Sequence, residues 1–475
     1  MPNLKLRNYQ ILAVEHIHEH KRCALFARMG MGKTPATLKT IDNMHLLGMT
    51  TPTLVIAPKR VAKNGWANET KKWDDLKHLE VSPIIGTPKE RHAALLRDVP
   101  IYSINYENLP WLIDHFGEKW PFKLVVADEA SKLKSLRISA RTSKSGKQYL
   151  QSNGGGQRAK ALAMIAHKHI TRFIALTGTP APNGLGDLWG QMWYIDGGQR
   201  LGRSYTAFEQ RWFRPKYNGF GIEPLPHAQQ EIESLISDVC LSLDPKDWFD
   251  LRAPIHVPVR FELPDKVREH YRDMEKEMFM ELECGAEIEA FNAGSKAMKC
   301  RQITAGFAYR EDGTFAALHD LKLQILESIY EEAGGTPLLV AYQFKADLER
   351  LMKAFPKGRV LDDNYQTILD FNKGEIPMLF AHPQSAGHGV DGLQYGTNIV
   401  VFFNNDWNLE CREQFIERVG PVRQMQAGNE RDVFIYDIVA EDTIDEVMLE
   451  RLASKASVQE SLLAAMKKRK SSLAR

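Results

Sequence analysis

A short glycine-rich segment, Gly30-Met31-Gly32-Lys33-Thr34, contains the residues with the clearest chemistry. Glycines allow backbone N–H groups to close around phosphates, a lysine brings a positive charge to the β- and γ-phosphate oxygens, and a threonine hydroxyl can hold Mg²⁺. Ala27 stands where the usual eight-residue pattern has its first glycine. The segment predicts a phosphate-binding loop, and a chance glycine-rich turn is the alternative.

An acidic pair, Asp128-Glu129, follows the apolar run Leu124–Ala127 and lies 95 residues after Lys33. A carboxylate at the carboxyl end of a parallel strand can reach a metal held by a phosphate-loop threonine. We therefore expect Thr34 and Asp128 to bind Mg²⁺, and Glu129 to orient and deprotonate an attacking water. A purely structural acidic pair is the alternative, and its place after a phosphate-binding loop argues against it.

Short apolar runs, each followed by turn residues and a helical pattern, occur in two groups along the chain. The first group is Cys23–Ala27, Leu54–Ala57, Ile101–Ile104, Leu124–Ala127 and Phe173–Leu176. The second group is Leu338–Ala341, Met378–Ala381, Ile399–Phe403 and Val433–Tyr436. This alternation predicts parallel strands with crossover helices, and hence two α/β sheets in tandem. We expect the boundary near Leu251, which gives domains of residues 1–250 and 251–475.

Other segments differ in composition. The stretch from about Leu185 to Glu332 has a mostly helical pattern, interrupted by the Pro-rich part Asp244–Pro264. Arg137–Gln157 is poor in hydrophobic residues and rich in Ser, Gly, Lys and Arg, so we expect a mobile loop. Apolar residues at helical spacing predict a C-terminal helix before a basic tail. They are Ile444, Val447, Met448, Leu452, Val458, Leu462 and Met466, and the tail is Lys467–Lys470.

The overall composition is that of a globular protein, because hydrophobic residues make up 43% and charged residues 26% of the 475. The net charge of +2 neither demands nor excludes a nucleic-acid partner, since a groove can be basic on a balanced protein. The five cysteines lack zinc-knuckle or redox-pair spacing, so we expect reduced thiols. We find no apolar run of membrane-spanning length and no signal peptide, and therefore expect a cytoplasmic protein.

Further motifs follow one another along the chain. They are Leu6–Gln10, Ala57–Arg60 with Trp66, Ser103–Glu107, Asp128–Ser131 with Lys134, Leu176–Pro180, Val340–Phe344, Ser385–Gln394, Asp406–Asn408 and Gln414–Arg418. In this order, and over nearly the whole chain, they resemble the motifs of superfamily 2 helicase-like ATPases. Among them, Asp128–Ser131 resembles the acidic box, Leu176–Pro180 motif III, Ser385–Gln394 motif V and Gln414–Arg418 the start of motif VI. Within that superfamily the chain is most similar to the SWI/SNF-type branch of double-stranded DNA translocases.

The resemblance implies two tandem RecA-like lobes, each a parallel sheet flanked by helices, with helical insertions and a C-terminal helix. It also implies hydrolysis of ATP with Mg²⁺. Catalytic roles then fall on Lys33, Asp128, Glu129, Arg418 and Arg423. ATP contacts are implied for the phosphate-binding loop Gly30–Thr34, for Gln10 and for Asp391. Nucleic-acid contacts are implied for Lys59, Arg60, Trp66, Tyr106, Thr179, Gln343 and Trp407.

The sequence departs from the family pattern at two informative positions. Ser131 replaces the usual histidine of the acidic box, which leaves the usual link to the second lobe in question. Pro421 stands where the second arginine of motif VI is expected, and Arg423 lies two residues further on. We hypothesise that a bend at Gly420-Pro421 presents Arg423, so that Arg418 and Arg423 both act as arginine fingers.

Two basic segments are candidates for phosphate contacts with a nucleic acid. The first interleaves tryptophans and comprises Lys59, Arg60, Lys63, Trp66, Lys71, Lys72 and Trp73, with a solvated helix face as the alternative. The second comprises Lys132, Lys134, Arg137, Arg141, Lys144 and Lys147, with a solvated insert as the alternative. No base-reading module is recognisable, so binding is expected to be sequence-independent and salt-sensitive.

The predicted function is an ATP-dependent translocase on double-stranded DNA, working as a monomeric motor with protein partners for targeting. A strand-separating DNA or RNA helicase is one alternative. A nucleotide-gated DNA clamp without turnover is another, although Lys33, Asp128, Glu129 and Arg418 argue for hydrolysis. The two lobes leave little room for the added domains of eukaryotic relatives, so a bacterial or phage origin is expected.

Overall fold

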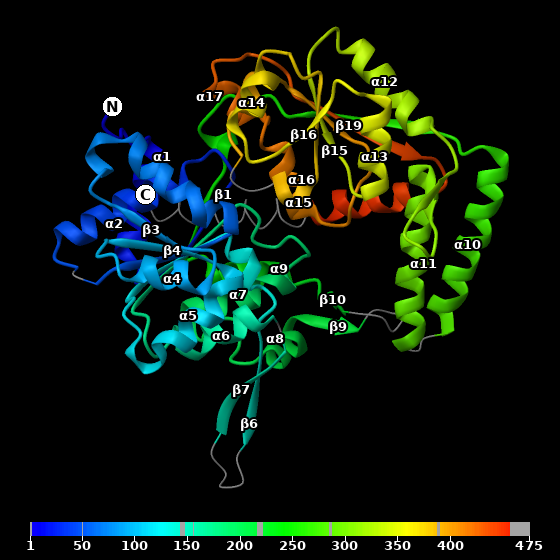
Figure 1. Cartoon of the computed structure of the whole chain (residues 1–475). Helices are drawn as coiled ribbons and strands as arrows, with labels where there is room; N and C mark the ends of the chain where they lie inside the picture. Colours follow the sequence, from blue (N-terminus) through cyan, green and yellow to red (C-terminus); the bar gives the residue numbers. More distant parts are fainter. Residues whose placement is uncertain are drawn as a thin grey trace. The chain divides into compact units, whose positions relative to one another are not determined.

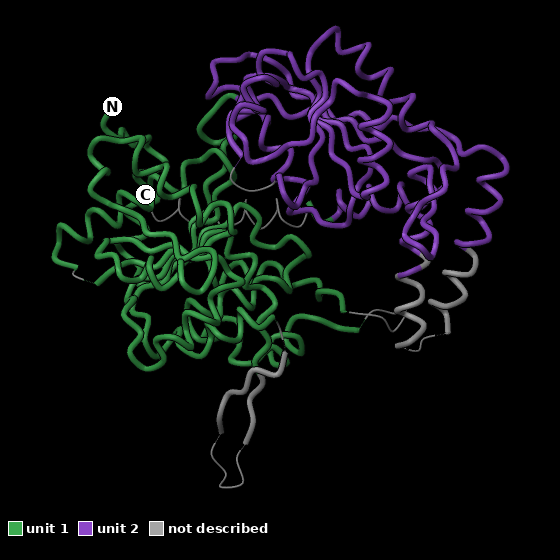
Figure 2. Tube along the Cα trace, viewed as in Figure 1, with its two compact units in different colours: residues 1–250, 455–475 green, residues 251–454 purple. Residues whose placement is uncertain are grey.

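The computed structural model describes residues 2–49, 51–142, 148–154, 156–215, 222–284, 287–386 and 390–456. It divides into two compact units, coloured separately in Figure 2. Unit 1 is built mainly from residues 1–250, and unit 2 consists of residues 251–454. Each unit contains its own parallel sheet with helices on both faces (Figure 1). The predicted fold class is therefore confirmed.

Within the described residues, the main sheet of unit 1 has seven strands in the order β11-β1-β8-β5-β2-β4-β3. All neighbours pair in parallel. The strands are β1 (Arg22–Ala27), β2 (Thr53–Ala57), β3 (Val81–Ile84), β4 (Ile101–Asn105), β5 (Leu124–Asp128), β8 (Arg172–Thr177) and β11 (Cys240–Leu243). A parallel sheet that is covered on both faces needs apolar residues at successive positions, which explains the continuous apolar runs.

Alternate residues of each strand of unit 1 enter separate cores on the two faces of the sheet. In β1, Leu25 packs with helices α1 (Asn8–Glu19), α2 (Lys33–Leu46) and α3 (Trp66–Lys72). Its neighbour Phe26 packs on the opposite face. The helices of that face are α5 (Leu109–Phe116), α6 (Gln157–Ala166), α7 (Gly186–Asp196), α8 (Tyr205–Trp212) and α9 (Ala228–Ile236). A further helix, α4 (Pro88–Leu95), lies at the β3 side of the sheet.

Unit 2 has, in its described part, a six-stranded parallel sheet in the order β12-β19-β18-β15-β17-β16. The strands are β12 (Ile255–Phe261), β15 (Leu338–Ala341), β16 (Arg359–Val360), β17 (Met378–Ala381), β18 (Ile399–Phe402) and β19 (Phe434–Ala440). The helices are α10 (Asp265–Cys284), α11 (Glu287–Ala305), α12 (Leu321–Glu332), α13 (Lys345–Ala354), α14 (Tyr365–Asn372), α15 (Pro383–Ala386), α16 (Leu409–Ile416) and α17 (Pro421–Gln426). Helices α10 and α11 lie side by side (Figure 1).

The sequence predictions agree with the structure in the interior of both sheets and differ elsewhere. Each predicted apolar run forms a strand within a few residues of the expected bounds. The segment Arg137–Gln157, expected as a mobile loop, instead contains paired antiparallel strands β6 (Arg137–Thr142) and β7 (Gln148–Gly154), and residues 143–147 lie outside the description. Short strands β9 (Phe213–Pro215), β10 (Ile222–Pro224), β13 (Phe307–Tyr309) and β14 (Phe315–Ala317) interrupt the stretch expected to be helical.

The C-terminal segment is described in part. Residues 444–456 are helical, as the spacing of Ile444, Met448 and Leu452 predicts, and these three side chains are buried. Val447 is helical as well, but its side chain is exposed. The last positions of the predicted helix and the basic tail lie outside the described residues. They are Val458, Leu462, Met466 and Lys467–Lys470.

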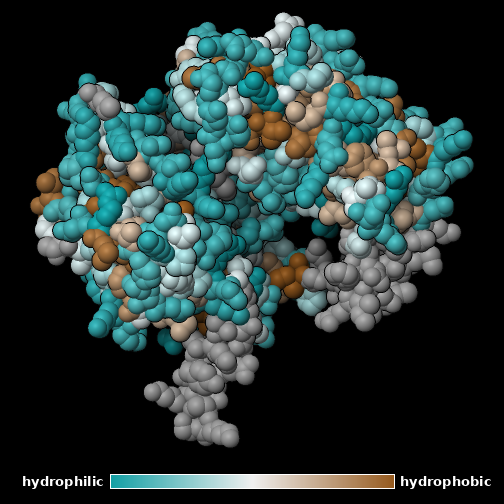
Figure 3. All heavy atoms as spheres, in the orientation of Figure 1, coloured by the Kyte–Doolittle hydropathy of each residue, from teal (hydrophilic) through white to brown (hydrophobic). Residues whose placement is uncertain are grey.

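The face of the molecule drawn in Figure 3 is mainly polar. Figure 3 shows that hydrophilic side chains predominate on one face, with hydrophobic side chains in scattered patches. In the part of the chain that the structure describes, no helix is both long enough and apolar enough to cross a membrane.

Helix α7 of unit 1 offers a direct test of the packing beneath the acidic box. A Cβ at Gly190 would lie 2.7 Å from the Lys134 carbonyl oxygen and 3.0 Å from the Leu133 carbonyl oxygen, both of them backbone atoms. Gly190→Ala is therefore expected to lower the free energy of unfolding of unit 1 by about 1–3 kcal/mol, measured by urea denaturation.

Gly186→Ala, in the same helix, is the matched control. Its Cβ would meet only Tyr205 Oη, at an ordinary contact distance of 3.7 Å. We expect stability to change by less than about 1 kcal/mol for this variant. Equal stabilities of the two variants would show that α7 does not pack against this turn as described.

Candidate functional site

The glycine-rich segment of unit 1 connects β1 to α2, as expected for a phosphate-binding loop. Gly30 and Gly32 have φ values of 80° and 67°, a backbone region that glycine enters without steric cost. Gly32 is the N-cap of α2, so Lys33 and Thr34 occupy the first turn, where unpaired backbone N–H groups favour an anion. Met31 is buried beneath the loop.

Gln10 of α1 packs directly against this loop. A Cβ at Gly32 would lie 2.0 Å from Gln10 Nε2, so the amide fills the space that glycine leaves open. Gln10 Oε1 accepts a hydrogen bond from the Arg7 backbone N–H at 2.9 Å, which fixes the side chain. The predicted adenine contact is thus next to the phosphate-binding loop, and its role in reading the base stays a prediction.

The loop after β8 lies against the phosphate-binding loop. A Cβ at Gly178 would be 3.4 Å from the Ala27 carbonyl oxygen and 3.7 Å from Lys33 Nζ. Lys33 Nζ itself donates a hydrogen bond to the Ala27 carbonyl at 2.6 Å. The neighbouring Thr179 is buried, and its N–H donates to Thr177 Oγ1 at 3.1 Å. Motif III therefore touches the lysine that is expected to bind phosphate.

The acidic pair lies at the carboxyl end of β5, one strand from β8 and two from β1 in the sheet order. Asp128 and Glu129 are both buried, and Glu129 has a left-handed backbone conformation with φ 61°. Burial raises the pKa of the Asp128 carboxyl group, whereas the nearby positive charge of Lys33 and a hydrogen bond from Trp66 lower it. A divalent cation at this position would favour the ionised carboxylate further.

Two aromatic side chains hold the acidic pair in place. Trp66 Nε1 donates to Asp128 Oδ2 at 2.9 Å, and Tyr106 Oη donates to the backbone carbonyls of Asp128 and Glu129 at 2.8 and 3.2 Å. Both side chains have 0% relative exposure. Their burial and hydrogen bonds favour a role in supporting the acidic pair over the expected nucleic-acid contacts of Trp66 and Tyr106, which stay predictions.

Most exposed side chains of the segment Lys59–Trp73 are basic. Lys59 is exposed and Arg60 is half-buried in the loop after β2. Lys63, Lys71 and Lys72 are also exposed. These side chains have accessible surface that a nucleic-acid backbone could contact. Their contacts with a nucleic acid remain predictions.

Asp187, which was not predicted from the sequence, connects Asn183 and Lys134. Its Oδ2 accepts hydrogen bonds from the Asn183 backbone N–H at 2.8 Å and from Asn183 Nδ2 at 3.0 Å. The same oxygen lies 3.5 Å from Lys134 Nζ. Asp187 thereby joins the lysine after the acidic box to the loop after β8. The only sequence signal was its place between Asn183 and the Leu188-Trp189 pair.

In unit 2, the two arginines of motif VI meet the end of motif V. Arg418 is buried, and its Nη1 donates to the Val390 carbonyl at 2.5 Å. Arg423 Nη1 donates to Asp391 Oδ1, also at 2.5 Å. Residues 387–389 of motif V lie outside the described residues.

Helix geometry explains the proline between these two arginines. Gly420 is the N-cap of α17 and Pro421 is its first residue, a position where the missing N–H costs no intrahelical hydrogen bond. Pro421 starts α17, and this helix places Arg423 beside Asp391. The residue before it, Val390, is the one that Arg418 contacts. The arrangement is compatible with the predicted arginine fingers, whose catalytic role remains a prediction.

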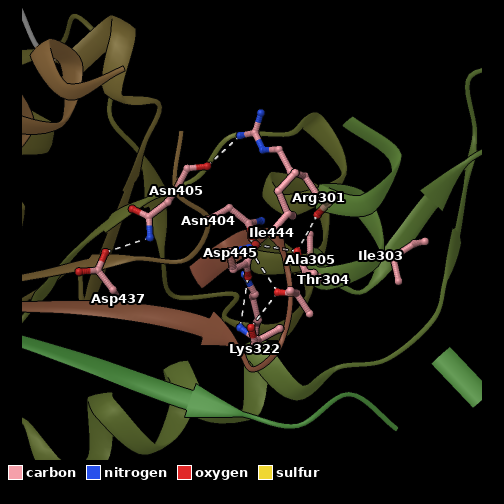
Figure 4. Close-up of polar contacts among 12 residues, drawn as sticks. Arg301, Ile303, Thr304, Ala305, Lys322, Asn404, Asn405, Asp437, Ile444 and Asp445 are labelled. Atoms are coloured by element: carbon pink, nitrogen blue, oxygen red, sulfur yellow. Dashed lines mark hydrogen bonds and ion pairs between the residues drawn. The ribbon is translucent and has the colours of Figure 1, made fainter. Parts of the chain in front are cut away.

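A buried polar network in unit 2, drawn in Figure 4, fixes the loops that carry Gln343 and Trp407. Lys322 has 1% exposure, and its Nζ donates to Asp445 Oδ2 at 2.9 Å and to Asn404 Oδ1 at 2.7 Å. Asn404 Nδ2 in turn donates to Asp347 Oδ2 at 2.8 Å. That carboxylate also accepts the backbone N–H of Gln343 at 3.2 Å.

The loop of Trp407 is tied to the same network through its preceding residues. Arg301 Nη2 donates to the Asn405 carbonyl at 2.8 Å and lies 3.6 Å from Asp406 Oδ1. Asn405 Nδ2 donates to Asp437 Oδ1 at 3.0 Å. Gln343 and Trp407 are half-buried, so both predicted nucleic-acid contacts retain accessible surface.

The oxygen ligands of unit 1 fit a nucleotide-bound Mg²⁺. Mg²⁺ usually takes one or two protein oxygens, with phosphates and water as its other ligands. In the described residues there is no group of three or more His, Cys, Asp or Glu side chains suited to hold a metal by itself. The Asp128 carboxylate and the Thr34 hydroxyl supply the smaller set that such a cation requires.

Comparison with known proteins identifies the class to which this fold and site belong. A family model described as SNF2-related domain matches residues 9–269. The chain therefore belongs to the SNF2-related family, and the resemblance to the SWI/SNF-type branch is confirmed.

Two relatives differ greatly in length. The chain is 51% identical over 470 residues to "Putative protein p41" of Acyrthosiphon pisum secondary endosymbiont phage 1, covering 98% of this chain and 99% of that protein. It is 24% identical to "Nuclear protein STH1/NPS1" of Saccharomyces cerevisiae, covering 97% of this chain but only 35% of the yeast protein.

A solved structure is also similar. The "Sulfolobus solfataricus SWI2/SNF2 ATPase core in complex with dsDNA" aligns with 97% of this chain and 93% of that chain, at 22% identity and a TM-score of 0.43.

The buried network of unit 2 generates a stability prediction. Asp445→Asn or Lys322→Met leaves a charged partner buried without its counter-ion, so each is expected to cost about 3–5 kcal/mol of unfolding free energy. The double variant should cost less than the sum of the two singles, because neither charge then remains. Urea denaturation of the four proteins measures this coupling.

The exposed ion pair between Arg252 and Asp432 is the control. Arg252 is 81% exposed and lies 3.1 Å from Asp432, so Arg252→Met is expected to cost less than about 1 kcal/mol. Strict additivity of the Lys322 and Asp445 variants would contradict the network described above.

Proposed function

We propose that this protein is an ATP-dependent translocase on double-stranded DNA, with ATP hydrolysed in unit 1 and DNA bound along its phosphates. The observation that carries the proposal is the meeting of Lys33, Asp128 and the loop of Gly178 at the carboxyl ends of β1, β5 and β8. In a chain of the SNF2-related family, this arrangement supports nucleotide hydrolysis coupled to movement on DNA.

Each residue of the proposed site in unit 1 has a separate role in ATP hydrolysis. Lys33 exchanges its bond to the Ala27 carbonyl for the β- and γ-phosphate oxygens, and Gln10 contacts the adenine. Thr34 and Asp128 hold Mg²⁺, which neutralises charge on the phosphates when it is bound. Glu129 orients the attacking water and accepts its proton.

The arginines of unit 2 complete the catalytic set in this proposal. Arg418 and Arg423 stabilise the negative charge on the transferred phosphoryl group when the two units close around ATP, and Asp391 orients Arg423. Because residues of both units are needed, DNA that favours the closed state accelerates hydrolysis.

The proposed DNA path uses side chains with accessible surface. Lys59 and Arg60 of unit 1, and Gln343 and Trp407 of unit 2, contact the phosphate backbone and the sugars. Thr179 is buried in the loop that touches Lys33, so its proposed contact with DNA requires that this loop move. Binding through phosphates makes affinity fall steeply with salt.

The first test is a panel of ATPase rates with duplex DNA, single-stranded DNA and RNA. We expect duplex DNA to stimulate hydrolysis most, and the stimulation to fall as salt rises because cations compete for the phosphates. Glu129→Gln should lower the stimulated rate about 10²–10⁴-fold while nucleotide binding is retained. Equal or greater stimulation by RNA would contradict the proposal, and the absence of turnover would favour a nucleotide-gated clamp.

The second test concerns the arginine fingers. Arg418→Ala and Arg423→Ala are each expected to lower the DNA-stimulated rate about 10³-fold or more, because each removes positive charge from the transferred phosphate. Nucleotide binding to unit 1, measured with a fluorescent ATP analogue, should remain.

Arg359→Ala is the matched control for this test. Arg359 is an exposed arginine of unit 2 that lies 3.5 Å from Asp370 and has no place in the proposed site. Its variant should keep the full rate. A fully active Arg423→Ala would remove that residue from the catalytic set.

A further inference from the structure

The indole of Trp66 has a role that contact with a nucleic acid does not explain. The ring is fully buried, and its N–H donates a hydrogen bond to a carboxylate oxygen of Asp128 at 2.9 Å. Trp73, the next tryptophan along the chain, is half-buried and donates to Glu69 at 3.1 Å, within its own segment. Of these two neighbouring indoles, only Trp66 reaches the acidic pair.

The backbone directly before Trp66 forms an irregular helical turn that is anchored to the sheet. A single π-helical turn, Val61–Gly65, precedes α3, and such turns change the direction of the side chains that follow them. Ser103 Oγ of β4 donates to the Ala62 carbonyl at 2.6 Å, which anchors the turn to the sheet. A Cβ at Gly65 would lie 3.1 Å from Val61 Cγ1, so the turn has little room for a larger residue.

The hydrogen bond restricts how the Asp128 carboxylate can turn. Its Oδ2 is engaged by the indole, while the phenol of Tyr106 holds the carbonyls of Asp128 and Glu129. Backbone and side chain of the residue are thus both fixed in a buried site. Groups that hydrogen-bond a metal-binding side chain in this way set its orientation and the affinity for the metal.

We propose that Trp66 is a positioning residue for the metal. Its indole N–H holds Asp128 Oδ2, so that Oδ1 stays available to the Mg²⁺ that accompanies the nucleotide. This inference rests on the proposed ATP site of unit 1, and it concerns metal-dependent nucleotide binding, which can be measured without DNA and without turnover.

The experiment is a thermal-shift titration of the full chain with a non-hydrolysable ATP analogue, with and without Mg²⁺. Trp66→Phe removes the N–H donor, and Trp73→Phe is the matched control. We expect Trp66→Phe to keep the shift that the metal-free analogue produces but to need about tenfold or more Mg²⁺ for the additional shift. Trp73→Phe should follow the wild-type Mg²⁺ dependence.

Two results with Trp66→Phe would overturn the inference. One is a wild-type Mg²⁺ dependence, which would show that the N–H does not matter to the metal. The other is loss of the metal-free shift to the same degree, which would show a structural role alone. If the wild-type chain shows no shift with the analogue at all, the proposed function fails as well, which separates the two claims.

The smaller phenylalanine ring leaves space in a core, so a second variant is needed in case it prevents folding. Benzothienylalanine placed at Trp66 keeps the shape of the indole and lacks the N–H. The expected result is the same increase in Mg²⁺ requirement with an unchanged unfolding temperature. A wild-type Mg²⁺ dependence with this side chain would contradict the proposal.

Discussion

The hydrogen bond that the buried Trp66 indole donates to the buried Asp128 carboxylate is the interaction on which the acidic end of the unit 1 site depends. Burial raises the pKa of the Asp128 carboxyl group, and the charge of Lys33 together with the Trp66 hydrogen bond offsets that effect only in part. The strand order β1-β8-β5 brings the phosphate-binding loop, the loop after β8 and the acidic pair to the same edge of the sheet, with Gly178 against Ala27 and Lys33.

The sequence predicted the interior of both sheets and missed their edges, for a physical reason. Interior strands such as β5 are covered on both faces and need continuous apolar residues, which are easily recognised. The strands that were missed are β3, β11, β12 and β16, and each is an edge strand. Edge strands tolerate proline and polar residues, as Pro83 in β3 and Pro258 in β12 show.

The parts of the site that could be predicted are those in which the chemistry requires particular residue types close together in the sequence. The phosphate-binding loop and the acidic pair lie at the ends of β1 and β5, as the motifs indicated. The burial of Trp66 was not predictable, because an aromatic residue among lysines has the same sequence pattern whether it faces a nucleic acid or a core. Tyr106 was assigned to a nucleic-acid contact only through the family resemblance of its motif. Lys322 gave no signal either, since its partners Asn404 and Asp445 lie 82 and 123 residues away.

A triplex-displacement assay tests the proposed translocation along duplex DNA most directly. A third strand bound to a duplex should be released in an ATP-dependent manner, while a forked duplex under the same conditions stays paired. Glu129→Gln should release no third strand. Unwinding of the fork, or hydrolysis of ATP without release of the third strand, would contradict translocation on double-stranded DNA.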